Sequence, residues 1–111
     1  IDSLIILGGL VGDPITKKYS KLSKKINEDD IMNIMKISSK YKVPKIIFIS
    51  TCSNYGLVNE TEFATEKHRL KPLSLYAKSK VKCEKYLFKL KFNTPVILRF
   101  IRQNAIRFDC Q

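Results

Sequence analysis

The chain has 111 residues, of which 44% are hydrophobic, and its formal net charge at pH 7 is +11. This length suits one small domain, and no apolar run reaches the roughly 20 residues that a membrane span needs. The opening stretch IDSLIILGGLVGDP lacks the basic leader of a secretory signal peptide. We therefore expect a globular domain without a membrane segment.

The strong positive charge invites comparison with nucleic-acid-binding proteins, but its pattern does not fit them. Seventeen of the 21 basic residues are lysine, and they are spread along the whole chain. Recognition of base edges favours the arginine fork, and a binding surface gathers its basic residues in one place. We therefore expect no nucleic-acid partner.

Cysteine and histidine give no sign of a metal site. The three cysteines, Cys52, Cys83 and Cys110, lack metal-ligand spacing, and an odd number with wide gaps indicates reduced thiols in a cytoplasmic protein. The single histidine, His68, lies in a polar stretch and is expected at the surface.

Two strands and a helix are predicted in the first half of the chain. A short apolar run closed by glycines predicts a buried strand over residues 3–7. Apolar residues at helical spacing predict one helix over residues 21–41. The run VPKIIFIST predicts a second buried strand at residues 45–50, and the polar stretch NYGLVNETEFATEKHRLKPLS is expected to be a loop.

A second helix and a third strand follow. Ser74 is a suitable N-cap for a helix over residues 74–91, and TPVILRF predicts a strand over residues 95–100, whereas residues 101–111 show no pattern. Continuous apolar strands that alternate with helices predict a parallel sheet covered on both faces. All strand carboxyl ends would then share one edge, where ligands bind in such sheets.

The stretch SLYAKSK places Tyr76 and Lys80 four residues apart. On a helix this spacing puts both side chains on one face. Tyr41 and Lys45 have the same spacing, but Pro44 lies between them and breaks a helix. Spacing alone therefore leaves two interpretations open, a proton-transfer pair or a tyrosine in a lysine-rich chain. The position of Tyr76, shortly after the loop that follows Thr51, favours the first.

Five segments match, in order, the pattern of one enzyme family. DSLIILGGLVGDP resembles its segment Asp-x-Val-Ile-His-Leu-Ala-Ala, and INEDDIMNIM resembles its helix start Asn-x-x-Gly-Thr. IIFISTCSNYG resembles its strand end Ser-Ser/Thr-x-x-Val-Tyr-Gly, PLSLYAKSKVKCEKYL resembles its helix Pro-x-Ser-x-Tyr-x-x-Ser-Lys, and TPVILRF resembles its next strand. Over residues 1–100 the chain thus resembles the extended short-chain dehydrogenase/reductases, in particular the NAD-dependent nucleotide-sugar epimerase/dehydratase family.

The resemblance implies an α/β fold of Rossmann type, a doubly wound parallel sheet present only in part. Three strands and two long helices would form the second half of an NAD(P)-binding domain over residues 1–100. The first βαβαβ half, with its glycine-rich phosphate fingerprint, has no counterpart, and residues 101–111 are a divergent tail. We therefore expect this chain alone to bind NAD weakly or not at all.

The resemblance also implies roles for three catalytic residues. Tyr76 would be the general acid/base at a sugar hydroxyl, and Thr51 would share a hydrogen bond with the reacting oxygen. Lys80 would bind the nicotinamide ribose. Together with the positive nicotinamide ring, it would lower the phenol pKa from about 10. NAD would take the hydride, and NADP is not excluded.

Family position further implies a set of residues along the cofactor: Leu7, Gly8, Gly9, Asn27, Ser50, Tyr76 and Lys80. Simpler interpretations stay open, because Thr51 can cap a strand, the two glycines can serve a turn, and Asn27 can be an ordinary helix residue. GGLVG is not the phosphate fingerprint.

The substrate implied is a nucleotide sugar. Cys52 and Ser53 stand where sugar dehydratases of the family carry Asp-Glu, which favours an epimerase over a dehydratase. We interpret the chain as a truncated copy of an epimerase-type enzyme. The resemblance also implies a homodimer through the two long helices, and the alternative is a catalytically inactive, oligomerising remnant of the same fold.

Overall fold

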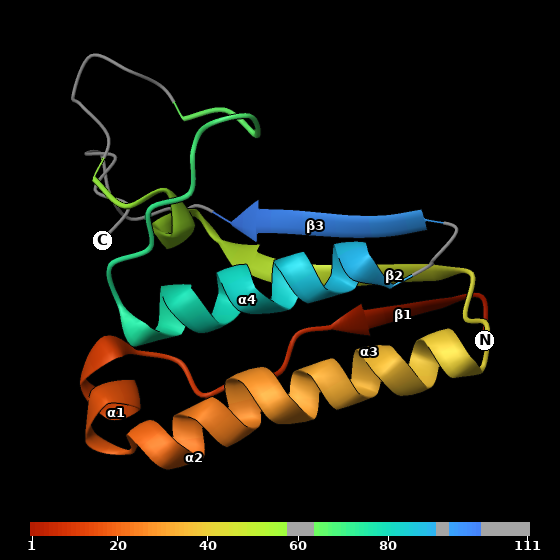
Figure 1. Cartoon of the computed structure of the whole chain (residues 1–111), viewed down its shortest axis with the longest axis horizontal. Helices are drawn as coiled ribbons and strands as arrows, with labels where there is room; N and C mark the ends of the chain where they lie inside the picture. Colours follow the sequence, from red (N-terminus) through yellow and green to blue (C-terminus); the bar gives the residue numbers. More distant parts are fainter. Residues whose placement is uncertain (58–63, 91–93, 101–111) are drawn as a thin grey trace.

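The computed structural model of the chain describes residues 1–57, 64–90 and 94–100. Its centre is a three-stranded parallel sheet in the order β1-β2-β3. Figure 1 shows the three strand arrows side by side, pointing the same way. The predicted strands are confirmed with shifts of one residue at some ends: β1 (Ser3–Ile6), β2 (Lys45–Thr51) and β3 (Thr94–Phe100). The carboxyl ends of the strands therefore share one edge, as the sequence predicts.

The helix predicted over residues 21–41 is confirmed in its length, but it is interrupted by a turn of π-helix. It consists of α2 (Ser20–Lys24), a π-helical turn (Lys25–Asp30) and α3 (Ile31–Lys40). A short helix, α1 (Asp13–Lys18), precedes it and was not predicted from the sequence. Proline in the first turn of α1 suits a helix start. Single π turns inside helices occur frequently at functional sites.

The second long helix, α4 (Leu75–Lys89), begins where the sequence predicts. The hydroxyl of Ser74 accepts a hydrogen bond from the backbone N–H of Ala77 at 3.1 Å, which confirms the N-cap. The stretch expected to be a loop contains a 3₁₀ turn (Cys52–Tyr55) directly after β2. The helix ends at Lys89, two residues before the predicted end at residue 91. The tail at 101–111 lies outside the described residues.

The hydrophobic core lies between one face of the sheet and the helices α3 and α4. Ile46 and Phe48 of β2, Met35 of α3 and Leu87 of α4 are all fully buried in it. Along β2 every second residue points to this face, as the pleat of a strand requires.

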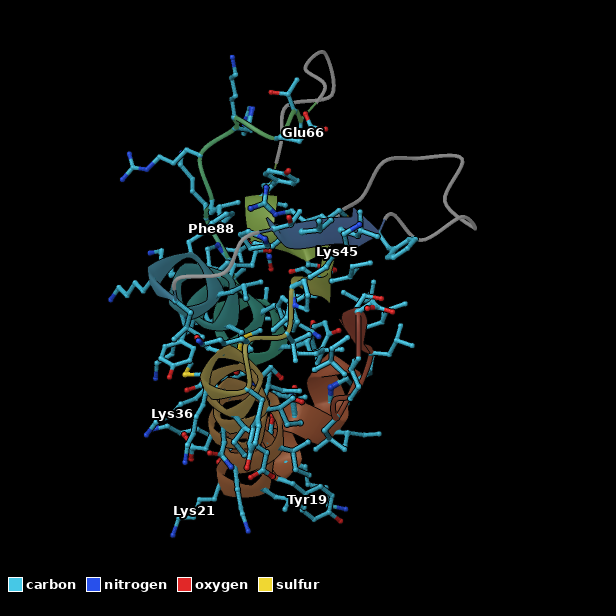
Figure 2. All side chains as sticks on the ribbon, turned by 90° about the vertical axis from the view of Figure 1, so that its right-hand side faces the viewer. Tyr19, Lys21, Lys36, Lys45, Glu66 and Phe88 are labelled. Carbon is cyan, nitrogen blue, oxygen red and sulfur yellow. The ribbon has the colours of Figure 1, made fainter. Side chains whose placement is uncertain are left out.

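The expectation that helices cover both faces of the sheet is wrong for the described residues. Ile5, Leu98 and Phe100 on the other face are 54%, 42% and 59% exposed. Figure 2 views the sheet from the side, with the helices on one side of it. The strand order explains the difference, because crossovers of one hand that advance in one direction across a sheet place their helices on the same face.

Gly56 closes the 3₁₀ turn in a conformation that suits glycine. Its φ is +70°, and a Cβ at this position would lie 2.3 Å from the carbonyl oxygen of Lys71. The same neighbour is fixed, because the N–H of Lys71 donates to the carbonyl of Asn54 at 2.9 Å. The turn after β2 is therefore packed directly against the segment that leads to α4.

Gly56→Ala should therefore lower the free energy of unfolding by about 1–3 kcal/mol. Gly8→Ala is the matched control, because a Cβ there meets nothing within 4 Å, and it should change stability by less than about 0.5 kcal/mol. Urea unfolding followed by circular dichroism measures both. Equal stability of Gly56→Ala and the unmutated chain would contradict this account of the turn.

Cys83 lies in the core, and burial raises the pKa of its thiol from 9.0 to about 12. Its Sγ donates to the backbone carbonyl of Asn27 at 3.1 Å. The unfolded thiol ionises first, so this contribution to stability is complete below pH 9.0 and is lost as pH rises toward 12. Lysines and tyrosines titrate in the same range, so we compare slopes with Cys83→Ala. Between pH 9 and 12 the free energy of unfolding should fall less steeply with pH in Cys83→Ala than in the unmutated chain. Equal slopes of the free energy of unfolding against pH would refute the prediction.

Candidate active site

Lys80 joins α4 to the carboxyl end of β2. Its Nζ donates to the backbone carbonyl of Ile49 at 2.9 Å. The same nitrogen lies 4.6 Å from the ring centroid of Phe48 and 5.6 Å from that of Tyr76. Lys80 is only 4% exposed. The first turn of α4 lies at the end of the sheet to which the strand arrows point (Figure 1). The structure thus brings the predicted pair together at the predicted edge.

Burial acts on both members of this pair, in opposite directions. It raises the pKa of the Tyr76 phenol and lowers the pKa of the Lys80 ammonium, while Cys83 and Glu84 partly restore the latter. The lowering was expected beside both Lys80 and a positive nicotinamide ring and stays a prediction, whereas in this structure burial raises the phenol pKa. The Lys80 charge faces the ring and binds a carbonyl. The cost of burying a phenolate therefore outweighs the attraction between the phenolate and the Lys80 charge. Tyr76 therefore carries a neutral phenol at pH 7.

Thr51 is the last residue of β2 and caps the 3₁₀ turn. Its Oγ1 accepts a hydrogen bond from the backbone N–H of Ser53 and donates to the Ser53 hydroxyl, both at 3.2 Å. The sequence left open a purely structural role as the cap of a strand, and the structure shows a structural role as the cap of the turn that follows the strand. Thr51 is also two residues beyond Ile49, the residue that binds Lys80. Its catalytic role stays a prediction.

Asn27 holds the loop that contains the two predicted glycines. Its Oδ1 accepts from the N–H of Leu10 at 2.7 Å, and its Nδ2 donates to the carbonyl of Leu10 at 2.9 Å and to Ser23 Oγ at 3.2 Å. A Cβ on Gly9 would lie 3.0 Å from the same Oδ1. Asn27 is 2% exposed, whereas Leu7 and Gly8 are exposed. A cofactor role for Asn27 stays a prediction. Its contacts favour an indirect role, in which Asn27 holds the glycine loop in place.

A buried polar cluster next to the pair was missed in the sequence. The carboxylate of Glu84 accepts hydrogen bonds from Ser50 Oγ at 2.6 Å, from Asn54 Nδ2 at 2.8 Å, and from Arg99 Nη2 and Nε at 2.6 and 3.1 Å. Arg99 Nη1 donates to the Tyr55 hydroxyl at 2.8 Å. These five residues form what we call the Glu84 cluster.

The Glu84 cluster changes the interpretation of Ser50, which was predicted to line the cofactor. The Ser50 hydroxyl instead points to the helix-covered face, where Glu84 is 2% exposed. Pairing with Glu84 raises the pKa of Arg99 above its already high ordinary value. The available signal in the sequence was position, because Glu84 lies one helical turn after Lys80 and Arg99 lies in a strand that otherwise reads as apolar.

The remaining sequence expectations concern single residues. The His68 ring packs edge-on against Tyr55 with centroids 6.1 Å apart. Cys52 and Cys83 are free and buried, and Cys110 lies outside the described residues. Within the described ranges, His, Cys, Asp and Glu form no group of three or more that could hold a metal ion. No helix in the same ranges is long and apolar enough to cross a membrane.

The fold of the chain is similar to that of two solved epimerases. UDP-glucose 4-epimerase from Thermus thermophilus, solved with NAD, superposes with a TM-score of 0.80 over 98% of this chain at 24% identity. UDP-N-acetylglucosamine 4-epimerase from Methanobrevibacter ruminantium superposes with a TM-score of 0.80 over 95% of this chain, also at 24% identity. These likenesses show the fold.

The chain spans only a part of these proteins. It covers 38% of the Thermus enzyme and 37% of the Methanobrevibacter enzyme. An uncharacterised protein from Methanocaldococcus jannaschii is 29% identical over 80 residues, which make up 72% of this chain and 24% of that protein. The family model that describes the NAD-dependent epimerase/dehydratase family matches residues 1–100. The chain therefore belongs to the NAD-dependent epimerase/dehydratase family.

Proposed function

We propose that residues 1–100 supply the acid/base half of an NAD-dependent epimerase that acts on nucleotide sugars. The observation that carries this proposal is the contact of Lys80 with Tyr76 and with the Ile49 carbonyl at the carboxyl end of β2. Ligands of open parallel sheets bind at this edge. The two solved structures described above are epimerases of UDP-sugars, one of them in complex with NAD, which supports a nucleotide sugar as the substrate class here.

The residues at this edge fit a nicotinamide cofactor. An ammonium group has three N–H donors, and in the described part of the chain Lys80 uses one of them on the Ile49 carbonyl. Two donors are left for a ribose hydroxyl, and Leu7 and Gly8 are open to solvent beyond β1. When bound, the nicotinamide would accept a hydride from a sugar carbon and return it to the other face.

Tyr76 would move the proton that accompanies this transfer. Its neutral phenol can donate to a sugar oxygen, and it takes a proton from a hydroxyl only when nearby positive charge lowers its pKa. The Lys80 ammonium is 5.6 Å from the ring centroid and supplies part of that charge. Burial of Lys80 keeps water from screening this interaction.

An epimerase fits the turn after β2 better than a dehydratase does. Elimination of water needs an acid that protonates the leaving hydroxyl. Cys52 and Ser53 offer no carboxyl group at the corresponding positions, and Cys52 is buried. Simple oxidation and reduction at one sugar carbon needs only Tyr76 as the acid/base.

Tyr76→Phe tests this function in the natural polypeptide that contains residues 1–111. We expect kcat for the interconversion of UDP-glucose and UDP-galactose to fall by about 10²–10⁴-fold, the usual contribution of a general acid/base. The phenyl ring retains its packing near Lys80, so NAD affinity by calorimetry should persist. Tyr86→Phe is the matched control, since Tyr86 lies on the same helix and packs against the core, and it should leave turnover unchanged. Unaltered turnover of Tyr76→Phe would overturn the proposal.

A second candidate function, an oligomerising role without catalysis, is favoured by the outer face of α3. Ile34, Ile37 and Tyr41 are 41%, 46% and 74% exposed and follow one another at helical spacing. Figure 2 shows Lys36 pointing away from the helices, so solvated charge lies next to this stripe. Exposed apolar stripes beside charged residues are typical of protein interfaces. A second copy of the chain would bury the stripe in a helix-to-helix homodimer.

Ile37→Lys should break this dimer, because it places a charge in the middle of the stripe. Ser20→Lys adds the same charge at an exposed position at the start of α2, more than three turns before Ile34, and should leave the dimer intact. Sedimentation velocity at high micromolar concentration measures both. A monomeric unmutated chain, or a dimer that survives Ile37→Lys, would rule out this interface.

A further inference from the structure

Glu84 is a buried carboxylate that binds three other elements at once. Its partners are Ser50 on β2, Asn54 in the 3₁₀ turn and Arg99 on β3, at donor–acceptor distances between 2.6 and 3.1 Å. Ser50 and Arg99 are direct neighbours in the sheet register. The carboxylate therefore connects α4 to both strands and to the turn at the edge where Lys80 and Tyr76 lie.

Tyr76, Lys80 and Glu84 are spaced by four residues along α4. This spacing places them on one face, with a rise of about 6 Å between successive members. Two of them contact consecutive residues of β2, since Lys80 binds the carbonyl of Ile49 and Glu84 binds the side chain of Ser50. Thr51 is the residue after that. The face of α4 is thus held against β2 by two successive polar contacts.

We propose that Glu84, acting through Arg99 and Ser50, is a positioning residue that fixes the rotation and axial position of α4, so that Tyr76 and Lys80 lie at the end of β2. This proposal deepens the proposed acid/base function and rests on it. The contacts of Glu84 are directional, whereas the apolar core of Ile46, Phe48 and Leu87 is not.

The energetics of buried ion pairs agree with a positioning role. Arg99 is partly buried and Glu84 is almost fully buried, so both lose hydration when the chain folds. Replacement of such a pair by apolar side chains of similar size is often neutral or stabilising, and fixing a unique register is its best attested use. A fork of two hydrogen bonds from one guanidinium also defines an orientation more sharply than a single bond does.

The same carboxylate is connected to the predicted catalytic threonine through Asn54. Asn54 Nδ2 donates both to Glu84 and to Ser50 Oγ, the latter at 2.9 Å. Asn54 belongs to the 3₁₀ turn that Thr51 caps. One group therefore sets the position of α4 and of the turn together, which brings all three predicted catalytic residues under one constraint.

A second polar contact of α4 provides the matched control. Glu28 accepts from Ser79 Oγ at 2.9 Å and from Lys82 Nζ at 2.8 Å, and so connects α4 to the π-helical turn rather than to the sheet. Glu28→Gln disturbs α4 through a contact between helices. The double variant Glu84→Leu/Arg99→Met removes the contact with the strands, and its net charge equals that of the unmutated pair.

The readout is the titration of Tyr76 in the chain labelled with ¹³Cζ-tyrosine, assigned by comparison with Tyr76→Phe. We expect the unmutated chain and Glu28→Gln to show a raised pKa for Tyr76. Glu84→Leu/Arg99→Met should fold with a lower urea midpoint, because the buried Ser50 and Asn54 donors lose the carboxylate. In the folded variant the pKa of Tyr76 should shift toward its ordinary value of 10.0, because the ring gains access to water. Arg99→Lys keeps the charge without the fork and should give an intermediate shift.

Two outcomes would overturn the proposal. One is a folded double variant in which the pKa of Tyr76 is as high as in the unmutated chain. The other is a double variant that does not fold, because the ion pair would then serve stability rather than position. Neither measurement needs cofactor or turnover, so loss of the proposed function in the Tyr76→Phe assay and loss of the positioning role are detected separately.

Discussion

The hydrogen bond from Lys80 to the Ile49 carbonyl is the contact on which the rest of the site depends. Lys80 is only 4% exposed, and this hydrogen bond holds its charge at the end of β2, close to the rings of Phe48 and Tyr76. A buried ammonium is costly unless it is paired with hydrogen-bond acceptors or rings. The arrangement of α4 against β2 therefore cannot change without exposing or stranding this charge, and Tyr76 is held with it.

Much of the fold could be predicted because its signals are local. The apolar runs of β2 and β3, the helical spacing before Tyr41 and the N-cap at Ser74 each follow from a few neighbouring residues. The one-sided helical layer could not be predicted, because it depends on strand order, which no local pattern encodes. The π turn at Asn27 was also hidden, since its spacing resembles that of an ordinary helix over so short a stretch.

The residues of the site likewise fall into those that local sequence could predict and those that depend on packing. Tyr76 and Lys80 could be paired from their spacing and from the strand-helix order, and the structure places them together. Glu84 and Arg99 could not, because they are 15 residues apart and form a pair only when α4 packs across β3. The rise that burial causes in the pKa of Tyr76 could not be predicted, because sequence shows charges but not burial. Ser50 was placed along the cofactor by family position, which does not reveal that its hydroxyl donates to Glu84 on the helix-covered face.

The position of Lys80 can be measured directly by nuclear Overhauser spectroscopy on the 111-residue chain. The account predicts cross-peaks from the ε-methylene protons of Lys80 to the ring protons of both Phe48 and Tyr76. It also predicts that Lys80→Met removes these cross-peaks while those of Lys82 with its surroundings remain. A Lys80 side chain with solvent-like shifts and no contact to either ring would contradict the account, because Tyr76 and the end of β2 would then share no common site.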